Sequence, residues 1–211
     1  TLLDTADDLG LALNKVLAKY GMPEVTAAQY YTQASNGANA LLKLGFGDKF
    51  ETHSLNALRQ LFLSFYQQDI ALKTRFFNGI EPLLGQLNAA NIPWGVVTNK
   101  PEFLTTPLLK EFSVFDYSKV TVCGDTLTVS KPSPEPMLLA AEQINILPAD
   151  IIYLGDAKRD IDAGIAAGMK TASVSWGYIA ADENLEDWKA DVILDSPEQL
   201  NNYIKQPIGN H

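Results

Sequence analysis

The sequence predicts an α/β protein whose parallel sheet is covered by helices on both faces, with a helical segment placed before most of the sheet. Short apolar runs alternate with helical patterns in the second part of the chain, which is typical of parallel strands joined by helices. No convincing strand interrupts residues 5–75. Several apolar runs end in polar or charged residues, and ligands of such sheets gather at the carboxyl ends of the strands.

The helical segment is predicted from apolar residues at helical spacing. The first helix covers residues 9–20, and Gly21 with Pro23 ends it. A short second helix is expected around residues 41–44, and a wide apolar stripe predicts a third helix over residues 52–68.

The expected strands and helices then alternate along the chain, as they do when right-handed crossovers connect parallel strands. The strands are predicted at residues 92–98, 121–124, 151–155, 171–176 and 191–194. The helices are predicted at residues 81–90, 102–112, 134–144 and 161–169.

Composition narrows the functional classes. The chain has 211 residues, 46% of them hydrophobic, and a net charge of −9. An acidic chain is unsuited to nucleic acid or to an anionic membrane, so we expect neither as a partner. Any phosphate site must be locally cationic, and Lys131 with a metal ion would supply the charge. No apolar run approaches the ~20 residues of a membrane span.

The cysteine and histidine content indicates the cellular compartment and the type of metal ion. Cys123 is the only cysteine, so an intrachain disulfide is excluded, which fits a cytoplasmic location. His53 and His211 are the only histidines, which argues against a histidine-rich zinc site. Paired acids favour an oxygen-ligated ion such as Mg²⁺.

Two strand ends carry groups suited to phosphate. Thr98 and Asn99 lie before Pro101, where they either cap a helix or present backbone N–H groups to an anion. Lys131 precedes Pro132 and is either a solvated charge or a cation aimed by a stiff loop.

Asp156 and Asp160 come after the apolar run 151–155. Either could cap the next helix, but two close acids repel each other unless a cation lies between them, which favours a metal site. In the helical segment, Asn36 and Gly37 form part of a polar turn. That turn is either an ordinary helix start or a loop that reads the substrate.

These segments together resemble the haloacid dehalogenase superfamily. Thr98-Asn99, Lys131-Pro132 and Gly155-Asp156-x-x-x-Asp160 have the order and approximate spacing of the superfamily's second, third and fourth motifs. The start, Thr1 to Ala6, is similar to the residues that come after the aspartates of the first motif. The resemblance covers essentially the whole chain and is nearest the phosphoglycolate phosphatase-like branch. The segments Trp94 to Pro101 and Trp176 to Ile179 are also similar to N-acetylmuramic acid 6-phosphate phosphatases of peptidoglycan recycling.

The resemblance implies a Rossmannoid three-layer core formed by residues 1–9 and 77–211, and an inserted alpha-helical cap formed by residues 10–76. It implies an Mg²⁺-dependent phosphatase with an aspartyl-phosphate intermediate. The catalytic residues would be Lys131 and Thr98, and the metal ligands Asp156 and Asp160. The phosphoryl group would meet the hydroxyl and backbone N–H of Thr98, Asn99 and Lys131. Cap residues Asn36 and Gly37 would read the leaving group.

One departure concerns the first motif. The superfamily's two catalytic aspartates match positions immediately before Thr1, and the strand that carries them is central to the sheet. Without that strand two sheet edges would be exposed, so we expect a short segment with both acids to precede Thr1.

The substrate is expected to be a small phosphorylated metabolite, either 2-phosphoglycolate or N-acetylmuramic acid 6-phosphate, and the protein a monomer or homodimer. A sugar phosphomutase and a non-catalytic phosphate-binding module remain alternatives. A dehalogenase is disfavoured, because the acids of the fourth motif suggest metal-assisted phosphate chemistry.

Overall fold

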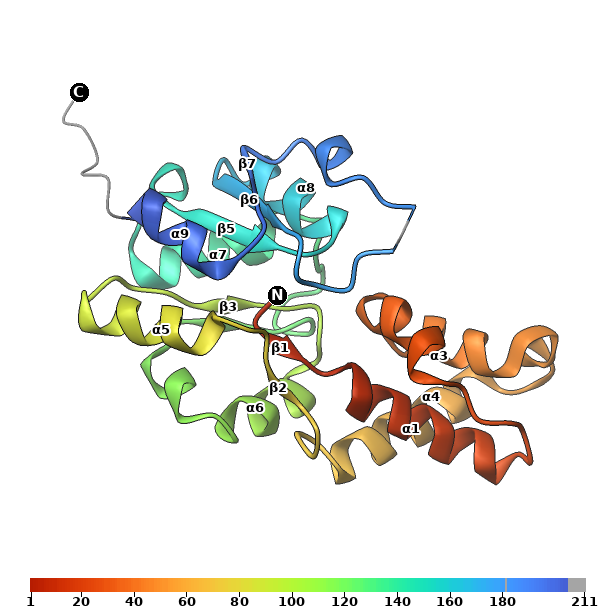
Figure 1. Cartoon of the computed structure of the whole chain (residues 1–211). Coiled ribbons are helices and arrows are strands. Elements are labelled where there is room, and N and C mark those ends of the chain that lie inside the picture. The colour runs from red at the N-terminus through yellow and green to blue at the C-terminus, as the bar shows by residue number, and fades with distance from the viewer. Residues whose placement is uncertain (181, 205–211) are drawn as a thin grey trace. The chain divides into compact units, whose positions relative to one another are not determined.

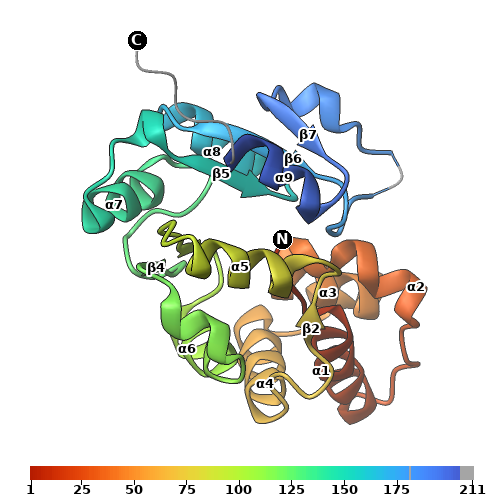
Figure 2. The same ribbon diagram turned by 60° about the vertical axis from the view of Figure 1, so that its left-hand side comes forward.

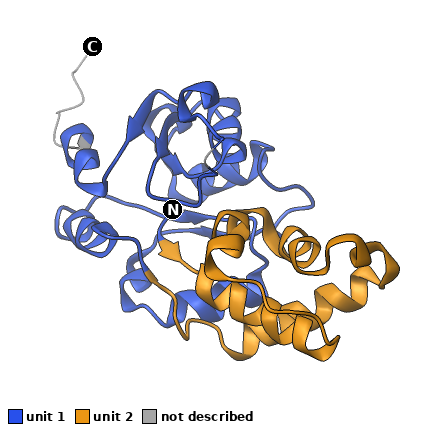
Figure 3. Ribbon diagram, turned by 45° about the vertical axis from the view of Figure 1, so that its right-hand side comes forward, with its two compact units in different colours: residues 1–2, 76–211 blue, residues 3–75 orange. Residues whose placement is uncertain are grey.

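The computed structural model describes residues 1–180 and 182–204, and the chain forms two compact units (Figure 3). One unit comprises Thr1–Leu2 and the chain from Phe76 onward, and the other comprises Leu3–Arg75. The second unit therefore begins at Leu3, whereas the sequence places the start of the cap at residue 10.

The unit Leu3–Arg75 is helical, as the apolar spacing predicts (Figure 1). The short strand β1 leads into it and pairs with β2 at its end. Its elements are β1 (Leu3–Asp4), α1 (Ala6–Lys19), α2 (Ala27–Tyr30), η1 (Tyr31–Asn36), α3 (Gly37–Phe46), η2 (Gly47–Thr52), α4 (Leu55–Gln68) and β2 (Arg75–Phe76).

Three of these helices bury apolar stripes against one another. Leu13 and Leu17 of α1, Leu42 of α3, and Leu58 and Phe62 of α4 are at most 1% exposed. Complete burial of side chains of this size stabilises the unit by about 1.5–3 kcal/mol each.

The other unit alternates strands and helices. All of its pairings between β3 and β7 are parallel: β3 pairs with β4, and β5 pairs with β6, which pairs with β7. Its elements are α5 (Ile80–Ala89), β3 (Val96–Val97), α6 (Glu102–Lys110), η3 (Ser113–Tyr117), β4 (Thr121–Val122), α7 (Glu135–Ile144), η4 (Pro148–Asp150), β5 (Ile152–Gly155), α8 (Lys158–Ala166), β6 (Lys170–Val174), η5 (Leu185–Trp188), β7 (Val192–Leu194) and α9 (Pro197–Ile204).

Helices cover both faces of the β5–β6–β7 sheet (Figure 2). On one face, Leu83 of α5 and Leu200 of α9 pack with Ala172 and Val174 of β6. On the other face, α7 and α8 pack their small side chains and Met137 against Tyr153 of β5. These three layers confirm the predicted α/β class.

Two of the boundaries that differ from the sequence-based expectation have a clear local cause. The strand β3 covers only Val96–Val97 of the predicted run 92–98. Residues at the start of the predicted run do not join the strand. The Ile92 N–H donates to Leu87 O at the end of α5, and Pro93 has no N–H to donate to a neighbouring strand. Conversely, α8 begins at Lys158 rather than at residue 161, because the Asp160 carboxylate accepts the Ala157 N–H at 3.1 Å and caps the first turn.

Candidate active site

Thr98 extends the end of β3. Its backbone N–H donates to Val122 O at 2.9 Å and continues the parallel ladder. The expectation that this N–H holds a phosphoryl oxygen is therefore wrong, because the neighbouring strand already uses it. The hydroxyl of Thr98 accepts the Lys100 N–H at 3.1 Å. A hydroxyl that accepts one bond retains its own hydrogen, which can be donated to an anion.

Asn99 ties the end of β3 to the loop that carries Lys131. Its amide nitrogen donates to Lys131 O at 2.9 Å, and its amide oxygen accepts the Lys131 N–H at 3.0 Å. These reciprocal bonds fix the backbone of Lys131. The backbone of Gly124 passes so close that an added Cβ would lie 2.1 Å from Asn99 O.

The ammonium group of Lys131 is buried and fully paired. The residue is 8% exposed, and its Nζ donates to Val97 O at 2.8 Å and to the Tyr153 hydroxyl at 2.8 Å. Asp160 Oδ1 lies 2.7 Å from the same nitrogen. Three acceptors match the three hydrogens of an ammonium group, so the side chain has one defined position.

Asp160 has two tasks in this arrangement. One carboxylate oxygen pairs with Lys131, and the other accepts the Ala157 N–H that starts α8. Gly155 makes room for it, because an added Cβ there would lie 2.2 Å from the Cβ of Asp160. The structure thus brings together the third-motif lysine and the second acid of the fourth motif.

Burial and hydrogen-bonding partners together determine the protonation states of Lys131 and Tyr153, which meet Asp160 at a junction between β3, β5 and α8. Burial lowers the pKa of Lys131, but Tyr153 and Asp160 outweigh that effect, so the pKa lies above its ordinary value. Burial raises the pKa of the Tyr153 hydroxyl to about 12, although Lys131 opposes the rise. At neutral pH the site therefore holds an ammonium ion beside a neutral phenol.

Asp156 lies directly after β5 and is 8% exposed. Its Oδ1 is 3.0 Å from the amino nitrogen of Thr1, and its Oδ2 accepts the Tyr178 N–H at 3.2 Å. Burial raises the pKa of this carboxyl, but its contacts with Thr1 and the hydrogen bond from the Tyr178 N–H hold it well below its usual range. Gly177 permits the contact, because an added Cβ would lie 2.2 Å from Asp156 Cβ.

The donor chemistry fits Mg²⁺ bound through few protein ligands. Within residues 1–180 and 182–204, no group of three or more His, Cys, Asp and Glu side chains is arranged to hold a metal. Mg²⁺ is commonly held by one or two carboxylates together with water and substrate phosphate. Asp156 offers a buried, ionised carboxylate at the end of β5, and its two oxygens accept donors from Thr1 and Tyr178, just as both oxygens of Asp160 accept protein donors.

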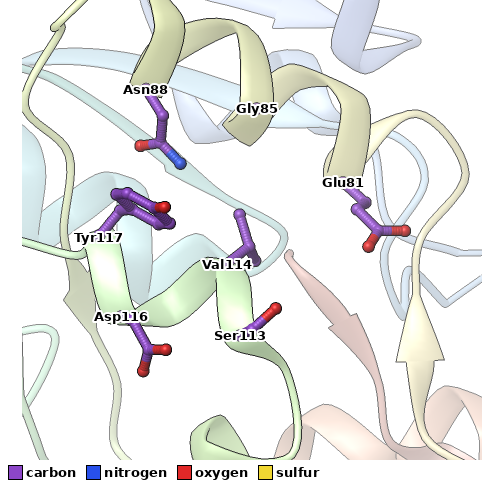
Figure 4. A pocket seen from close by; sticks show the side chains of 7 residues that line it. All are labelled: Glu81, Gly85, Asn88, Ser113, Val114, Asp116 and Tyr117. Carbon is purple, nitrogen blue, oxygen red and sulfur yellow. The ribbon is translucent and has the colours of Figure 1, made fainter.

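The remaining candidate features are a hollow in the α/β unit and the predicted substrate-binding turn of the helical unit. A hollow between α5 and η3 contains none of the predicted site residues (Figure 4); it is lined by Glu81, Gly85, Asn88, Ser113, Val114, Asp116 and Tyr117. Asn36 and Gly37 belong to the helical unit, where Asn36 donates to Gln33 at 3.1 Å and Gly37 begins α3 with a φ of 80°. Both are exposed, and their role in reading a substrate stays a prediction.

A three-layer α/β fold with a lysine and carboxylates at its strand ends is typical of α/β enzymes, whose ligands bind at that edge of the sheet. The chain belongs to the haloacid dehalogenase-like hydrolase family, whose sequence pattern matches residues 1–174. The predicted family is confirmed.

Two curated relatives show how far the similarity extends. An N-acetylmuramic acid 6-phosphate phosphatase of Pseudomonas aeruginosa is 41% identical over 200 residues, which cover 95% of this chain and 88% of the relative. A phosphoglycolate phosphatase of Xanthomonas campestris is 37% identical over 200 residues, covering 95% and 90% of the two chains.

The fold has a counterpart among solved structures. A predicted phosphoglycolate phosphatase from Haemophilus somnus superposes with a TM-score of 0.86, covers 97% of this chain and 94% of its own, and is 24% identical. Separately, none of the helices in the described part of the chain has the length and apolar character needed to cross a membrane.

Sequence reasoning misses two features of the site. The apolar run predicts Tyr153 only as part of a strand, although a partly buried tyrosine hydroxyl usually finds a polar partner. The sequence of the loop after β6 does not predict its contact with Asp156 through the Tyr178 N–H. Gly177 is the available signal, since a glycine beside a site often marks a close approach of backbone.

Proposed function

We propose that this protein is an Mg²⁺-dependent phosphatase that acts on N-acetylmuramic acid 6-phosphate, with 2-phosphoglycolate as the second candidate substrate. The 41% identity to a phosphatase named for the sugar phosphate supports the first choice, and the 37% identity to a phosphoglycolate phosphatase supports the second. The carrying observation is the position of Lys131, paired with Asn99 and Asp160 next to the end of β3.

Phosphate recognition begins with Thr98 and Lys131. The Thr98 hydroxyl accepts the Lys100 N–H and can donate its own hydrogen to a phosphoryl oxygen. The Lys131 ammonium is kept charged by Asp160 and neutralises part of the phosphate charge. A fixed cation in a buried site needs little reorganisation as charge shifts during reaction.

Asp156 would hold the metal ion. Asp160 would position the Lys131 ammonium group beside the metal and the phosphate. When bound, Mg²⁺ offsets the repulsion between the phosphate dianion and the carboxylates. The Tyr178 N–H and the space left by Gly177 keep the Asp156 carboxylate in place.

The reaction would use the two acids of the superfamily's first motif. A carboxylate oxygen of the first attacks phosphorus, and the bond from phosphorus to the ester oxygen breaks. The second acid gives its proton to the departing alcohol and then takes a proton from the water that hydrolyses the aspartyl-phosphate. The helical unit Leu3–Arg75 would serve as the cap, with Asn36 and Gly37 as candidates for contacts with the leaving group.

A cytoplasmic location remains part of the proposal. Cys123 is buried and unpaired, as expected of a thiol that is never required to form a disulfide. The protein would act as a monomer or a homodimer.

A phosphate-release assay on the full-length protein tests the proposal. With Mg²⁺ present, we expect kcat/KM for N-acetylmuramic acid 6-phosphate to exceed that for 2-phosphoglycolate. The reverse order would replace the first substrate by the second. Release from neither compound, with a related phosphatase active in the same assay, would contradict the proposed function.

A further inference from the structure

Tyr153 belongs to the strand β5, three positions before the candidate metal ligand Asp156. Its ring packs with the cluster of α7 and α8 that contains Met137 and Ala163. The backbone of Tyr153 is in register with Thr171 of β6. Both the ring and the backbone are therefore held by the sheet and its covering helices.

The hydroxyl of Tyr153 completes a triangle of hydrogen bonds. It accepts the Lys131 Nζ–H at 2.8 Å and donates to Val97 O at 3.0 Å. Lys131 Nζ also donates to Val97 O at 2.8 Å. One phenol thus contacts both the candidate catalytic cation and the backbone carbonyl that precedes Thr98.

The triangle has a consequence for substrate binding. All three ammonium hydrogens of Lys131 have acceptors, so a phosphoryl oxygen can bind there only by replacing one of them. Of the three acceptors, Asp160 carries a charge, so breaking its pair with Lys131 would cost the most free energy. Val97 O is the replaceable one, because Tyr153 still donates to it and no buried carbonyl is left without a donor.

We propose that Tyr153 is a positioning residue for Lys131, holding the ammonium on the Thr98 side of the site while it exchanges Val97 O for a phosphoryl oxygen. The inference rests on the proposed phosphatase function. It assigns Tyr153 no contact with the substrate. The hydroxyl acts through Lys131, so its loss has an effect only while that lysine is present.

A double-mutant cycle tests the assignment in the full-length protein. Tyr153→Phe keeps the ring and removes the hydroxyl; we expect kcat for N-acetylmuramic acid 6-phosphate to fall about 10-fold, as for loss of a hydrogen bond to a charged group, with KM changed less than about 2-fold. Lys131→Ala and the double variant should have equal kcat values. Independent effects that multiply in the double variant, or a Tyr153→Phe enzyme with wild-type kcat, would overturn the proposal.

Two additions keep the result interpretable. If Tyr153→Phe does not fold, Tyr153→Met removes the same hydroxyl while filling the space, and the same outcomes apply. The ¹H–¹⁵N signal of the Lys131 ammonium gives a readout that needs no turnover: we expect it in the wild type and expect it shifted or broadened in Tyr153→Phe. An unchanged signal would refute the contact even if the enzyme proved to act on another substrate, whereas a wild type inert toward both substrates would overturn only the proposed function.

Discussion

Lys131 Nζ and Asp160 Oδ1 lie 2.7 Å apart, and each side chain is only 7% exposed. The pair joins the loop before α7 to the first turn of α8. Removing one partner of a buried ion pair leaves an unpaired charge, which costs far more than the pair itself contributes. The stability of the α/β unit and the charge of its candidate phosphate site therefore depend on the same contact.

Asp160→Asn should weaken both properties. Lys131 would lose its charged partner, so we expect the free energy of unfolding to fall by about 3 kcal/mol and kcat to drop with it. Chemical denaturation measures the first effect. The control is Asp162→Asn, which breaks an exposed pair with Lys158 and should cost less than about 0.5 kcal/mol. Equal losses in the two variants would contradict the buried-pair argument.

Gly177→Ala tests the packing around Asp156. The new Cβ would meet Asp156 Cβ at 2.2 Å and displace the carboxylate, so we expect kcat/KM to fall about 10- to 100-fold and half-activation to require more Mg²⁺. Gly85→Ala is the matched control, because an added Cβ there meets nothing within 4 Å and the helix gains a better former. Wild-type magnesium dependence in Gly177→Ala would show that this glycine does not position Asp156.

Asp191 links β6 and β7 and provides a pH-dependent contribution to stability. Hydrogen bonds from the backbone and hydroxyl of Thr171 lower the pKa of Asp191. A lowered pKa adds stability above the unfolded-state value, and that stability is lost as the pH falls through the folded-state value. Asp191→Asn should thus be less stable than the wild type at pH 7, by under about 1 kcal/mol because the group is exposed, and the difference should shrink below about pH 4. Unfolding curves at several pH values measure it; a constant difference would contradict the assignment.

Metal removal tests the role assigned to Asp156. EDTA followed by desalting should abolish phosphate release, and Mg²⁺ should restore it. Zn²⁺ should not be the better activator, since an oxygen-only site favours hard cations. Full turnover in the presence of the chelator would remove the metal from the mechanism.

The strand ends could be predicted from the sequence because each apolar run stops at a polar residue. Thr98 and Asp156 lie directly after β3 and β5 for that reason. Most helices were also predictable, since their apolar stripes repeat over several turns, but α2 and α9 were not predicted. The exact start of α8 was not predictable, because it depends on the hydrogen bond that the Asp160 carboxylate accepts from the Ala157 N–H.

Partners in space could not be predicted in the same way. The pairing of Lys131 with Tyr153 joins residues 22 positions apart, and the contact of Tyr178 with Asp156 also spans 22 positions. No periodicity encodes such contacts, because they depend on how loops return to the sheet. The hydrogen bond from the Thr98 N–H to Val122 O likewise depends on the register of β3 and β4, which the sequence does not specify.

Replacement of Lys131 tests the central claim most directly. With N-acetylmuramic acid 6-phosphate and Mg²⁺, kcat of Lys131→Ala should fall by at least about 100-fold, as for loss of a fixed electrostatic group. Lys158→Ala, which breaks only the exposed pair with Asp162, should keep wild-type turnover. A Lys131→Ala enzyme that is folded and within a few-fold of the wild type would contradict the account.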